Sequence, residues 1–363
     1  MKFGILDYLT ESSIEQAVIG TVGKVSCYQC RYVNELPSDI SELTAVMAWH
    51  YLKIDSQTID RLSSCRVIVR VGVGIDNVDV EYAGKVGIPV VHIPDYGTND
   101  VADHAFGLLL TIARKIHYYN ENIQNNPVQG WNPNISLPVF RLTGKVIGII
   151  GFGRIGMSMA ARAKAFGMNV VFYDPYKADG YDKMLQIKRV ETLDELIPQV
   201  DVLSIHAPLT SETRGMISKD ILAKAKRGFT LINTARGEIV SLDAVYESMQ
   251  KGDMMHFAAD VLEQEPPAHD HPLLKAYHDK EPWLDGRVVL TPHAGFYAEE
   301  TRREMRQKAA IQMLHAGIGQ PLTNCVNEKW LLNSRAIIDM KRVSIPVKSD
   351  DKEYSHEVGS IPN

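Results

Sequence analysis

Residues 151–156 read Gly-Phe-Gly-Arg-Ile-Gly, and this motif gives the strongest indication of the fold. An apolar run, Lys145–Ile150, precedes it, and a run with helical spacing, Arg154–Phe166, starts inside it. A second apolar run ends at Tyr173, immediately before Asp174. Glycines at this spacing between a strand and a helix are typical of the first turn of a doubly wound α/β sheet.

Each glycine of this motif has a mechanical purpose. Gly151 permits the tight turn, Gly153 lets a pyrophosphate approach the backbone, and Gly156 lets the helix lie close to the sheet. The first helical residues, Arg154 and Ile155, then present free N–H groups and the positive end of the helix dipole to the phosphates.

Asp174 follows Gly156 by 18 residues. An acidic residue here binds the ribose hydroxyls of NAD and repels the 2′-phosphate of NADP. The alternative is a glycine-rich loop with a purely structural acid. The order of strand, helix, strand and acid favours a dinucleotide site, so we predict NAD as the cofactor.

Alternating strands and helices predict an α/β fold with two doubly wound parallel-sheet domains. The predicted strands of the dinucleotide-binding Rossmann domain are 145–150, 169–173, 201–206, 229–233, 256–261 and 288–291. Those of a smaller flavodoxin-like domain are 2–7, 24–30, 44–49, 67–71 and 89–93. We expect the smaller, substrate-binding domain to comprise residues 1–100 and 296–330, the NAD-binding domain residues 101–295, and a C-terminal tail residues 331–363. One connecting helix is expected over 100–120.

Composition excludes several classes of function. The 39 basic and 44 acidic side chains give a net charge of −5, so nucleic acid is not an expected partner. No apolar run is long enough to span a membrane, and the N-terminus lacks the pattern of a signal peptide, so a cytoplasmic location is expected. Cys27 and Cys30 form a CxxC motif without a second pair, which we interpret as structural, so no metal site is predicted.

Three polar side chains follow predicted strands of the larger domain. Arg236 follows the strand 229–233, Glu265 follows 256–261, and His293 follows 288–291. Doubly wound folds place their sites at the carboxyl ends of the strands. A proton donor and a cation at this edge suit a nicotinamide enzyme that acts on a carbonyl group.

The sequence resembles the D-isomer-specific 2-hydroxyacid dehydrogenase family over about residues 40–328. The motifs GFGRIG, NTARGEIV, ADVLEQEP and LTPHAG occur in the order and spacing of that family. Within the family the chain is most similar to the C-terminal binding protein branch, through residues 70–77, 172–176, 292–297 and 324–327. One departure is Phe296, which stands where that branch has a tryptophan lining the substrate pocket.

The resemblance implies a role for each site residue. His293 would exchange the carbonyl proton, Glu265 would favour the protonated imidazole, and Arg236 would bind the carboxylate of a 2-keto or 2-hydroxy acid. Further substrate contacts are implied for Val71, Gly72, Val73, Gly74 and Phe296. Cofactor contacts are implied for His206, Pro208, Thr234, Ala235 and Asp260. A homodimer is also implied.

Two alternatives stay open at this point. The chain could be an NAD(H)-sensing, dimeric co-regulator resembling C-terminal binding protein, because that branch keeps the catalytic residues. The substrate could instead carry a second anionic group, phosphate or phosphonate, bound by Arg70, Arg141 or Lys145.

Overall fold

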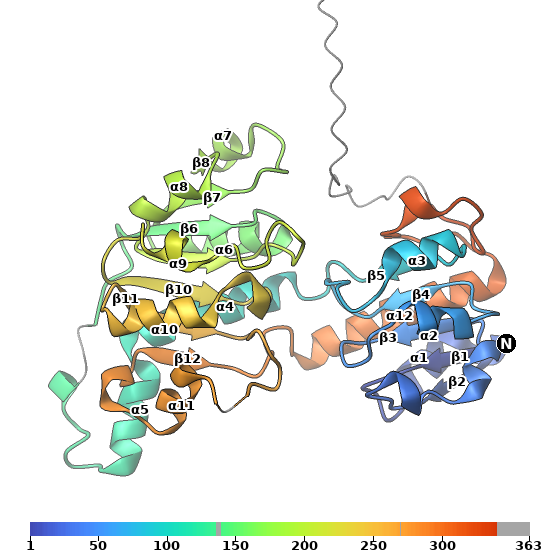
Figure 1. The fold of residues 1–363 in the computed structure, drawn as a ribbon, viewed down its shortest axis with the longest axis horizontal. Coiled ribbons are helices and arrows are strands. Elements are labelled where there is room, and N and C mark those ends of the chain that lie inside the picture. The colour runs from blue at the N-terminus through green and yellow to red at the C-terminus, as the bar shows by residue number, and fades with distance from the viewer. Residues whose placement is uncertain (136–138, 269, 340–363) are drawn as a thin grey trace, which may run out of the picture.

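The structure is a computed structural model that describes residues 1–135, 139–268 and 270–339. Two α/β lobes lie side by side and are joined by two crossings of the chain (Figure 1). We call them the small lobe, built on a five-stranded sheet, and the large lobe, built on a seven-stranded sheet. Among the described helices, none is long and apolar enough to cross a membrane.

The small lobe has a parallel sheet with the strand order β2-β1-β3-β4-β5, which is the flavodoxin-like order. Helices cover both faces: α1 and α12 pack on one face, and α2 and α3 on the other. The strands are β1 (Lys2–Ile5), β2 (Lys24–Cys27), β3 (Ala45–Ala48), β4 (Ile68–Arg70) and β5 (Val90–His92). The helices are α1 (Ser13–Ile19), α2 (Ser56–Arg61), α3 (Val80–Lys85) and α12 (Glu299–Ile318).

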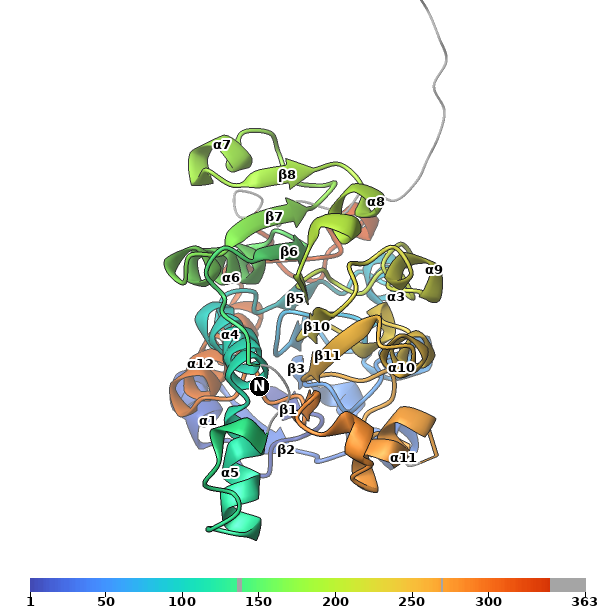
Figure 2. The same ribbon diagram turned by 90° about the vertical axis from the view of Figure 1, so that its left-hand side faces the viewer.

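The large lobe has a parallel sheet with the order β12-β11-β10-β9-β6-β7-β8, the Rossmann order with one added strand. Alternate residues of its strands face opposite sides. In β6, Ile147 and Ile149 pack with α4 and α6, whereas Ile150 joins the cluster under α8, α9, α10 and α11. Figure 2 shows α4 and α6 on one side of this sheet and α10 on the other. The strands are β6 (Val146–Ile150), β7 (Asn169–Tyr173), β8 (Lys188–Val190), β9 (Val202–Ile205), β10 (Phe229–Asn233), β11 (Met254–Ala259) and β12 (Val288–Leu290). The helices are α4 (Thr98–Arg114), α5 (Ile116–Asn125), α6 (Arg154–Ala165), α7 (Tyr181–Leu185), α8 (Leu193–Leu196), α9 (Lys219–Leu222), α10 (Leu242–Gln250) and α11 (Pro272–His278).

The two sheets confirm the predicted fold class. The sequence analysis missed one strand of the larger sheet, β8, which lies at its edge beside β7.

The prediction of one connecting helix over residues 100–120 is wrong. The helix breaks at Lys115, whose φ of +55° is left-handed, and α4 and α5 follow on either side. The Lys115 ammonium is fully buried, where it lies 2.8 Å from His256 Nε2 and donates to the carbonyl oxygen of Gly286. These tertiary contacts account for a break that the local sequence does not signal.

The chain returns to the small lobe after the second crossing. Met305, Ala309 and Met313 of α12 lie in the core of the small lobe. The segment that follows also packs there, because Arg335 donates hydrogen bonds to the carbonyl oxygens of Leu62, Ser63 and Cys65. The remainder of the predicted tail, residues 340–363, lies outside the described residues.

Candidate active site

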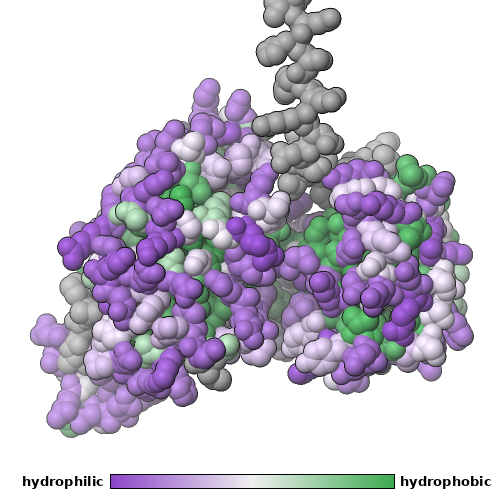
Figure 3. All heavy atoms as spheres, viewed as in Figure 1, coloured by the Kyte–Doolittle hydropathy of each residue, from purple (hydrophilic) through white to green (hydrophobic). Residues whose placement is uncertain are grey.

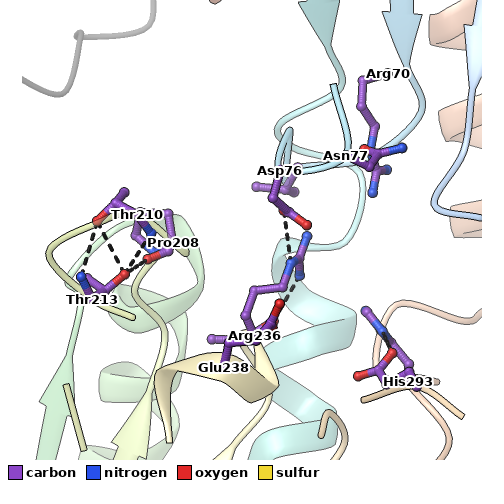
Figure 4. A network of polar contacts seen from close by, with 12 residues as sticks. Arg70, Asp76, Asn77, Pro208, Thr210, Thr213, Arg236, Glu238 and His293 are labelled. Atoms are coloured by element: carbon purple, nitrogen blue, oxygen red, sulfur yellow. Dashed lines mark hydrogen bonds and ion pairs between the residues drawn. The ribbon is translucent and has the colours of Figure 1, made fainter. Parts of the chain in front are cut away.

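The three side chains singled out at strand ends lie at one edge of the large lobe, facing the small lobe. Arg236 follows β10, Glu265 follows β11 and His293 follows β12. Nδ1 of His293 lies 2.7 Å from a carboxylate oxygen of Glu265. Figure 3 shows the cleft between the lobes, and Figure 4 shows Arg236 pointing to Asp76 on a loop of the small lobe, with His293 on a separate segment. The structure therefore brings the three predicted residues to one cleft.

Asp260 fixes the loop that carries His293. Its buried carboxylate accepts hydrogen bonds from the amides of Ala294 and Gly295, each at 2.8 Å, and from the hydroxyl of Thr291 at 2.6 Å. Nε2 of His104 on α4 lies 2.9 Å from the same hydroxyl. Burial alone would raise the pKa of Asp260, but the contact with His104, whose Nε2 lies 3.4 Å from a carboxylate oxygen, and the hydrogen bonds from Thr291 and the two amides lower it below its ordinary value. An ionised Asp260 thus holds the loop that carries His293 in place.

Arg236 reaches across the cleft to the small lobe. Its Nε donates to Asp76 at 3.1 Å, and one terminal nitrogen donates to the carbonyl oxygen of Ala235 at 2.8 Å (Figure 4). A Cβ on Gly74 would lie 1.8 Å from the other terminal nitrogen of Arg236. Burial acts to raise the pKa of Asp76, but the charges of Arg236 and Arg70 and the hydrogen bonds to the carboxylate together hold that pKa below its usual value. The guanidinium is therefore oriented by groups from both lobes.

A second guanidinium lies against the same loop. Arg70 is buried and donates from Nε to Asn77 at 3.3 Å, and its Nη1 donates to the carbonyl oxygen of Val71. A Cβ on Gly72, whose φ is +149°, would lie 1.9 Å from that Nη1. Within the described part of the chain, Arg70 forms no ion pair with a carboxylate at 4.0 Å or less. The glycines of the Val71–Gly74 loop thus make room for two arginines.

The aromatic walls of the cleft come from the second crossing of the chain and from the small lobe. The ring of Phe296 lies 6.3 Å from that of His293 at an angle of 83°. On the small lobe, the ring of His50 lies 6.1 Å from that of His293 and within 30° of parallel. The sequence analysis missed His50, because no motif surrounds it and only the tertiary fold brings it to His293.

The glycine-rich turn has the predicted local structure. Gly151 follows β6 with a φ of +83°, and Gly153 is the N-cap of α6. Asp174 accepts hydrogen bonds from the amides of Phe152 at 2.8 Å and Tyr176 at 3.0 Å. The hydrogen bond from the amide of Phe152 connects Asp174 to the glycine-rich turn, so the predicted phosphate and ribose sites are adjacent.

Polar atoms without partners mark the same edge of the sheet. Nδ1 of His206, after β9, and Oγ1 of Thr234, after β10, are buried and have no hydrogen-bond partner among the described residues. Burial lowers the pKa of His206 to about 4. The carbonyl oxygen of Pro208 accepts from the hydroxyl of Thr213 at 2.7 Å (Figure 4). A bound dinucleotide would supply partners for the two unsatisfied atoms, so the residues present fit this cofactor.

Two cations proposed for a second anionic group lie elsewhere. Lys145 precedes β6, at the opposite edge of the sheet, and lies 3.6 Å from Asp201. Arg141 is exposed and adjoins Phe140, whose amide donates to the carbonyl oxygen of Ala113 at the far end of α4. The interpretation of Lys145 and Arg141 as candidate substrate ligands is therefore wrong, and Arg70 alone lies at the cleft.

The order of strands, the glycine-rich turn and the imidazole–carboxylate pair at the carboxyl ends of the strands are together typical of a dinucleotide-binding protein. Comparison with known proteins gives the family. Residues 106–295 match the model of the "D-isomer specific 2-hydroxyacid dehydrogenase, NAD binding domain". The chain belongs to this family, and this part of it is an NAD-binding domain.

Relatives extend the similarity beyond that domain. The chain is 33% identical over 322 residues to D-3-phosphoglycerate dehydrogenase of Archaeoglobus fulgidus, which covers 89% of this chain and 57% of that protein. It spans less than two thirds of the length of the curated relatives that it matches.

Solved structures share the fold of both lobes. The TT0316 protein of Thermus thermophilus has a TM-score of 0.79 and 30% identity, over 90% of this chain and 100% of that chain. The D-lactate dehydrogenase of Aquifex aeolicus, crystallised with NAD and lactic acid, has a TM-score of 0.72 and 27% identity, over 85% of this chain and 93% of that chain.

Proposed function

We propose that this protein is an NAD-dependent oxidoreductase that interconverts 2-keto acids and D-2-hydroxy acids. The observation that carries the proposal is the pairing of His293 with Glu265 at 2.7 Å, in the cleft that also holds the Arg236 guanidinium. Reduction of a keto acid needs a proton for the carbonyl oxygen and a counter-charge for the carboxylate. The cleft offers both groups.

The catalytic roles follow from the orientation of the imidazole. Because Nδ1 of His293 faces Glu265, Nε2 is the atom left to exchange a proton with the substrate oxygen. His293 gives this proton during reduction and takes it back during oxidation. Arg236 binds the carboxylate and polarises the carbonyl group, with the Val71–Gly74 backbone and Phe296 as further substrate contacts.

NAD(H), when bound, supplies or accepts the hydride. We assign the pyrophosphate to the turn from Gly151 to Gly156 and the adenine ribose to Asp174. Each carboxylate oxygen of Asp174 already accepts a hydrogen bond from a backbone amide, which fixes the position of the carboxylate. A 2′-phosphate here would therefore meet a fixed negative charge. The other proposed cofactor contacts are His206, Pro208, Thr234, Ala235 and Asp260.

A substrate with a second anionic group is the other candidate within the same reaction. It is favoured by one observation: Arg70 is a buried guanidinium that has no ion-pair partner in the described part of the chain and packs against the proposed carboxylate-binding loop. A buried charge without a counter-ion is costly, and an anionic substrate group would relieve this cost. The name of the archaeal relative, D-3-phosphoglycerate dehydrogenase, fits such a substrate.

The proposed assembly, a homodimer, rests on exposed apolar side chains of the large lobe. Ile116, Val128 and Trp131, on and after α5, are exposed, and α5 projects from the large lobe (Figure 1). We propose that this region contacts a second copy in a homodimer.

We also propose a cytoplasmic location and a division into two domains. The four cysteines are free, which fits a reducing cytoplasm. We assign residues 1–100 and 296–330 to the substrate-binding domain and 101–295 to the NAD-binding domain, because α12 packs in the small lobe.

The test is oxidation of NADH by the purified protein with a panel of 2-keto acids, with and without a phosphate group. We expect turnover that needs His293, and Arg70→Gln should raise the KM of the phosphorylated substrates selectively if they are the natural ones. Tight NADH binding with feeble turnover across the whole panel would contradict the proposal. That result would favour an NAD(H)-sensing binding protein similar to the C-terminal binding protein branch.

A further inference from the structure

His50 is the group at the cleft to which the proposed reaction gives no role. It follows β3 and lies between aromatic rings: Tyr51 at 4.4 Å and Tyr8 at 5.2 Å on the small lobe, and His293 at 6.1 Å across the cleft. Neither ring nitrogen of His50 has a hydrogen-bond partner among the residues that the structure describes. The imidazole therefore lies next to the catalytic base with its hydrogen-bonding capacity unused.

The loop that carries His50 is held rigidly. The buried carboxylate of Asp7 accepts hydrogen bonds from the amides of Trp49 at 2.6 Å, Tyr51 at 2.9 Å and Leu52 at 3.1 Å. The side chain of Asn77 donates to the carbonyl oxygens of Trp49 and Leu52, at 2.8 and 3.0 Å. The same Asn77 accepts from Arg70. A loop fixed at so many points holds its side chain in a set position, as a binding site requires.

His50 is a neutral imidazole at neutral pH. Burial, together with the positive charge of Arg70, lowers its pKa to about 4. One of its nitrogens is therefore a donor and the other an acceptor. The two arginines of the cleft can only donate, so His50 adds an acceptor beside them without adding charge. This chemistry matches a hydroxyl group, which both donates and accepts.

We propose that His50 is a specificity-determining residue that binds a hydroxyl group on C3 of the substrate, so that 3-hydroxy-2-keto acids are preferred over their 3-deoxy analogues. The inference rests on the proposed function, because it places the C2 oxygen at His293. A C3 hydroxyl oxygen is only three bonds from that oxygen, and His50 is the polar ring that faces His293. Phe296, which lies 6.3 Å from His293, offers no such hydrogen bond.

The test uses ligands that differ by this one hydroxyl group. D-glycerate and D-lactate share the carboxylate and the C2 hydroxyl, and neither reacts with the NADH-bound protein, so calorimetry reports binding alone. We expect the wild type to bind D-glycerate about fivefold to tenfold more tightly, the effect of one neutral hydrogen bond. His50→Phe should remove this preference while it leaves the affinity for D-lactate unchanged. His50→Asn, which keeps a donor and an acceptor, should retain part of it.

Other outcomes overturn the inference. For the wild type, these are equal affinity for both ligands and no binding of either ligand. For His50→Phe, they are an unchanged preference for D-glycerate and an equal loss of affinity for both ligands. Turnover of hydroxypyruvate and pyruvate by the same variants separates this inference from the proposed function. Turnover with a preference independent of His50 contradicts the inference alone. A His50-dependent binding preference without turnover of any 2-keto acid contradicts the proposed function alone.

Discussion

The imidazole of His293 is oriented by two acids that act in different ways. Glu265 contacts the ring, whereas Asp260 holds the backbone around it, where His293 has a φ of +54°. Thr291 links Asp260 to His104 on α4. The position of the His293 ring is therefore coupled to α4, the helix at which the chain enters the large lobe.

Replacing the proposed proton donor should abolish chemistry without loss of cofactor. We expect His293→Ala to lower kcat by about 10²- to 10⁴-fold, because general acid catalysis contributes about this much. Glu265→Gln should have a smaller effect, since it keeps a polar partner beside the ring. The measurement is steady-state kinetics together with the Kd for NADH, with the exposed His278→Ala on α11 as the control. Full activity in His293→Ala would rule out its proposed role.

The sequence predicted the site only where a motif or a strand end marked it. Arg236, Glu265 and His293 each follow an apolar strand, and the strand order brings them to one edge. His50 and Asp7 carry no such signal, because their contacts depend on how β1 and β3 pair. The directions of Arg70 and Lys145 could not be predicted either, since an isolated basic residue does not indicate which edge of a sheet it faces.

The turn into α6 contains two glycines with different surroundings. A Cβ on Gly156 would lie 2.1 Å from the carbonyl oxygen of Gly151, so α6 would have to move away from β6. A Cβ on Gly153 would meet no atom within 4 Å. Gly156 is therefore required for the packing of the protein itself, whereas Gly153 leaves open space where we place the pyrophosphate.

The two corresponding alanine variants should therefore separate folding from cofactor binding. Gly156→Ala should lower the free energy of unfolding by about 1–3 kcal/mol, as overpacking does. Gly153→Ala should change it by less than about 0.5 kcal/mol yet weaken NADH binding. Urea unfolding without cofactor and a fluorescence titration with NADH measure the two effects. Wild-type NADH affinity in Gly153→Ala would contradict the proposed pyrophosphate site.

The predicted strands agree with the observed strands to within a few residues, because apolar runs are strong in both sheets. Two features were not predicted. The strand β8 has three residues, Lys-Arg-Val, and pairs on one side only, so it lacks an apolar run. The break at Lys115 depends on contacts with His256 and Gly286, far along the chain.

Buried histidines make the stability of the folded protein depend on pH. Burial lowers the pKa of His206 to about 4 and, together with the charge of Lys115, that of His256 to about 3. In the unfolded chain both return to about 6.5. Between these values the unfolded state binds more protons, so stability is full above about pH 6.5 and falls as the pH is lowered.

We expect the free energy of unfolding of the cofactor-free protein to fall between pH 7 and pH 5, with about 2 kcal/mol from each of these histidines. His256→Gln should remove its share of this dependence, because glutamine does not titrate. Urea unfolding at both pH values measures the effect, and the exposed His278→Gln is the matched control. An equal pH dependence in His256→Gln and in the wild type would contradict the expectation.

The cleft is assembled from two separate lobes, with Asp76 and His50 on one and Arg236 and His293 on the other. By the proposed roles, the small lobe selects the acid and the large lobe carries out hydride transfer. The two lobes can therefore change independently of each other. A chimaera that exchanges the small lobe of one relative for another should inherit new substrate preference and keep its cofactor. Because α12 returns to the small lobe, such a graft needs two junctions, one before α4 and one before α12.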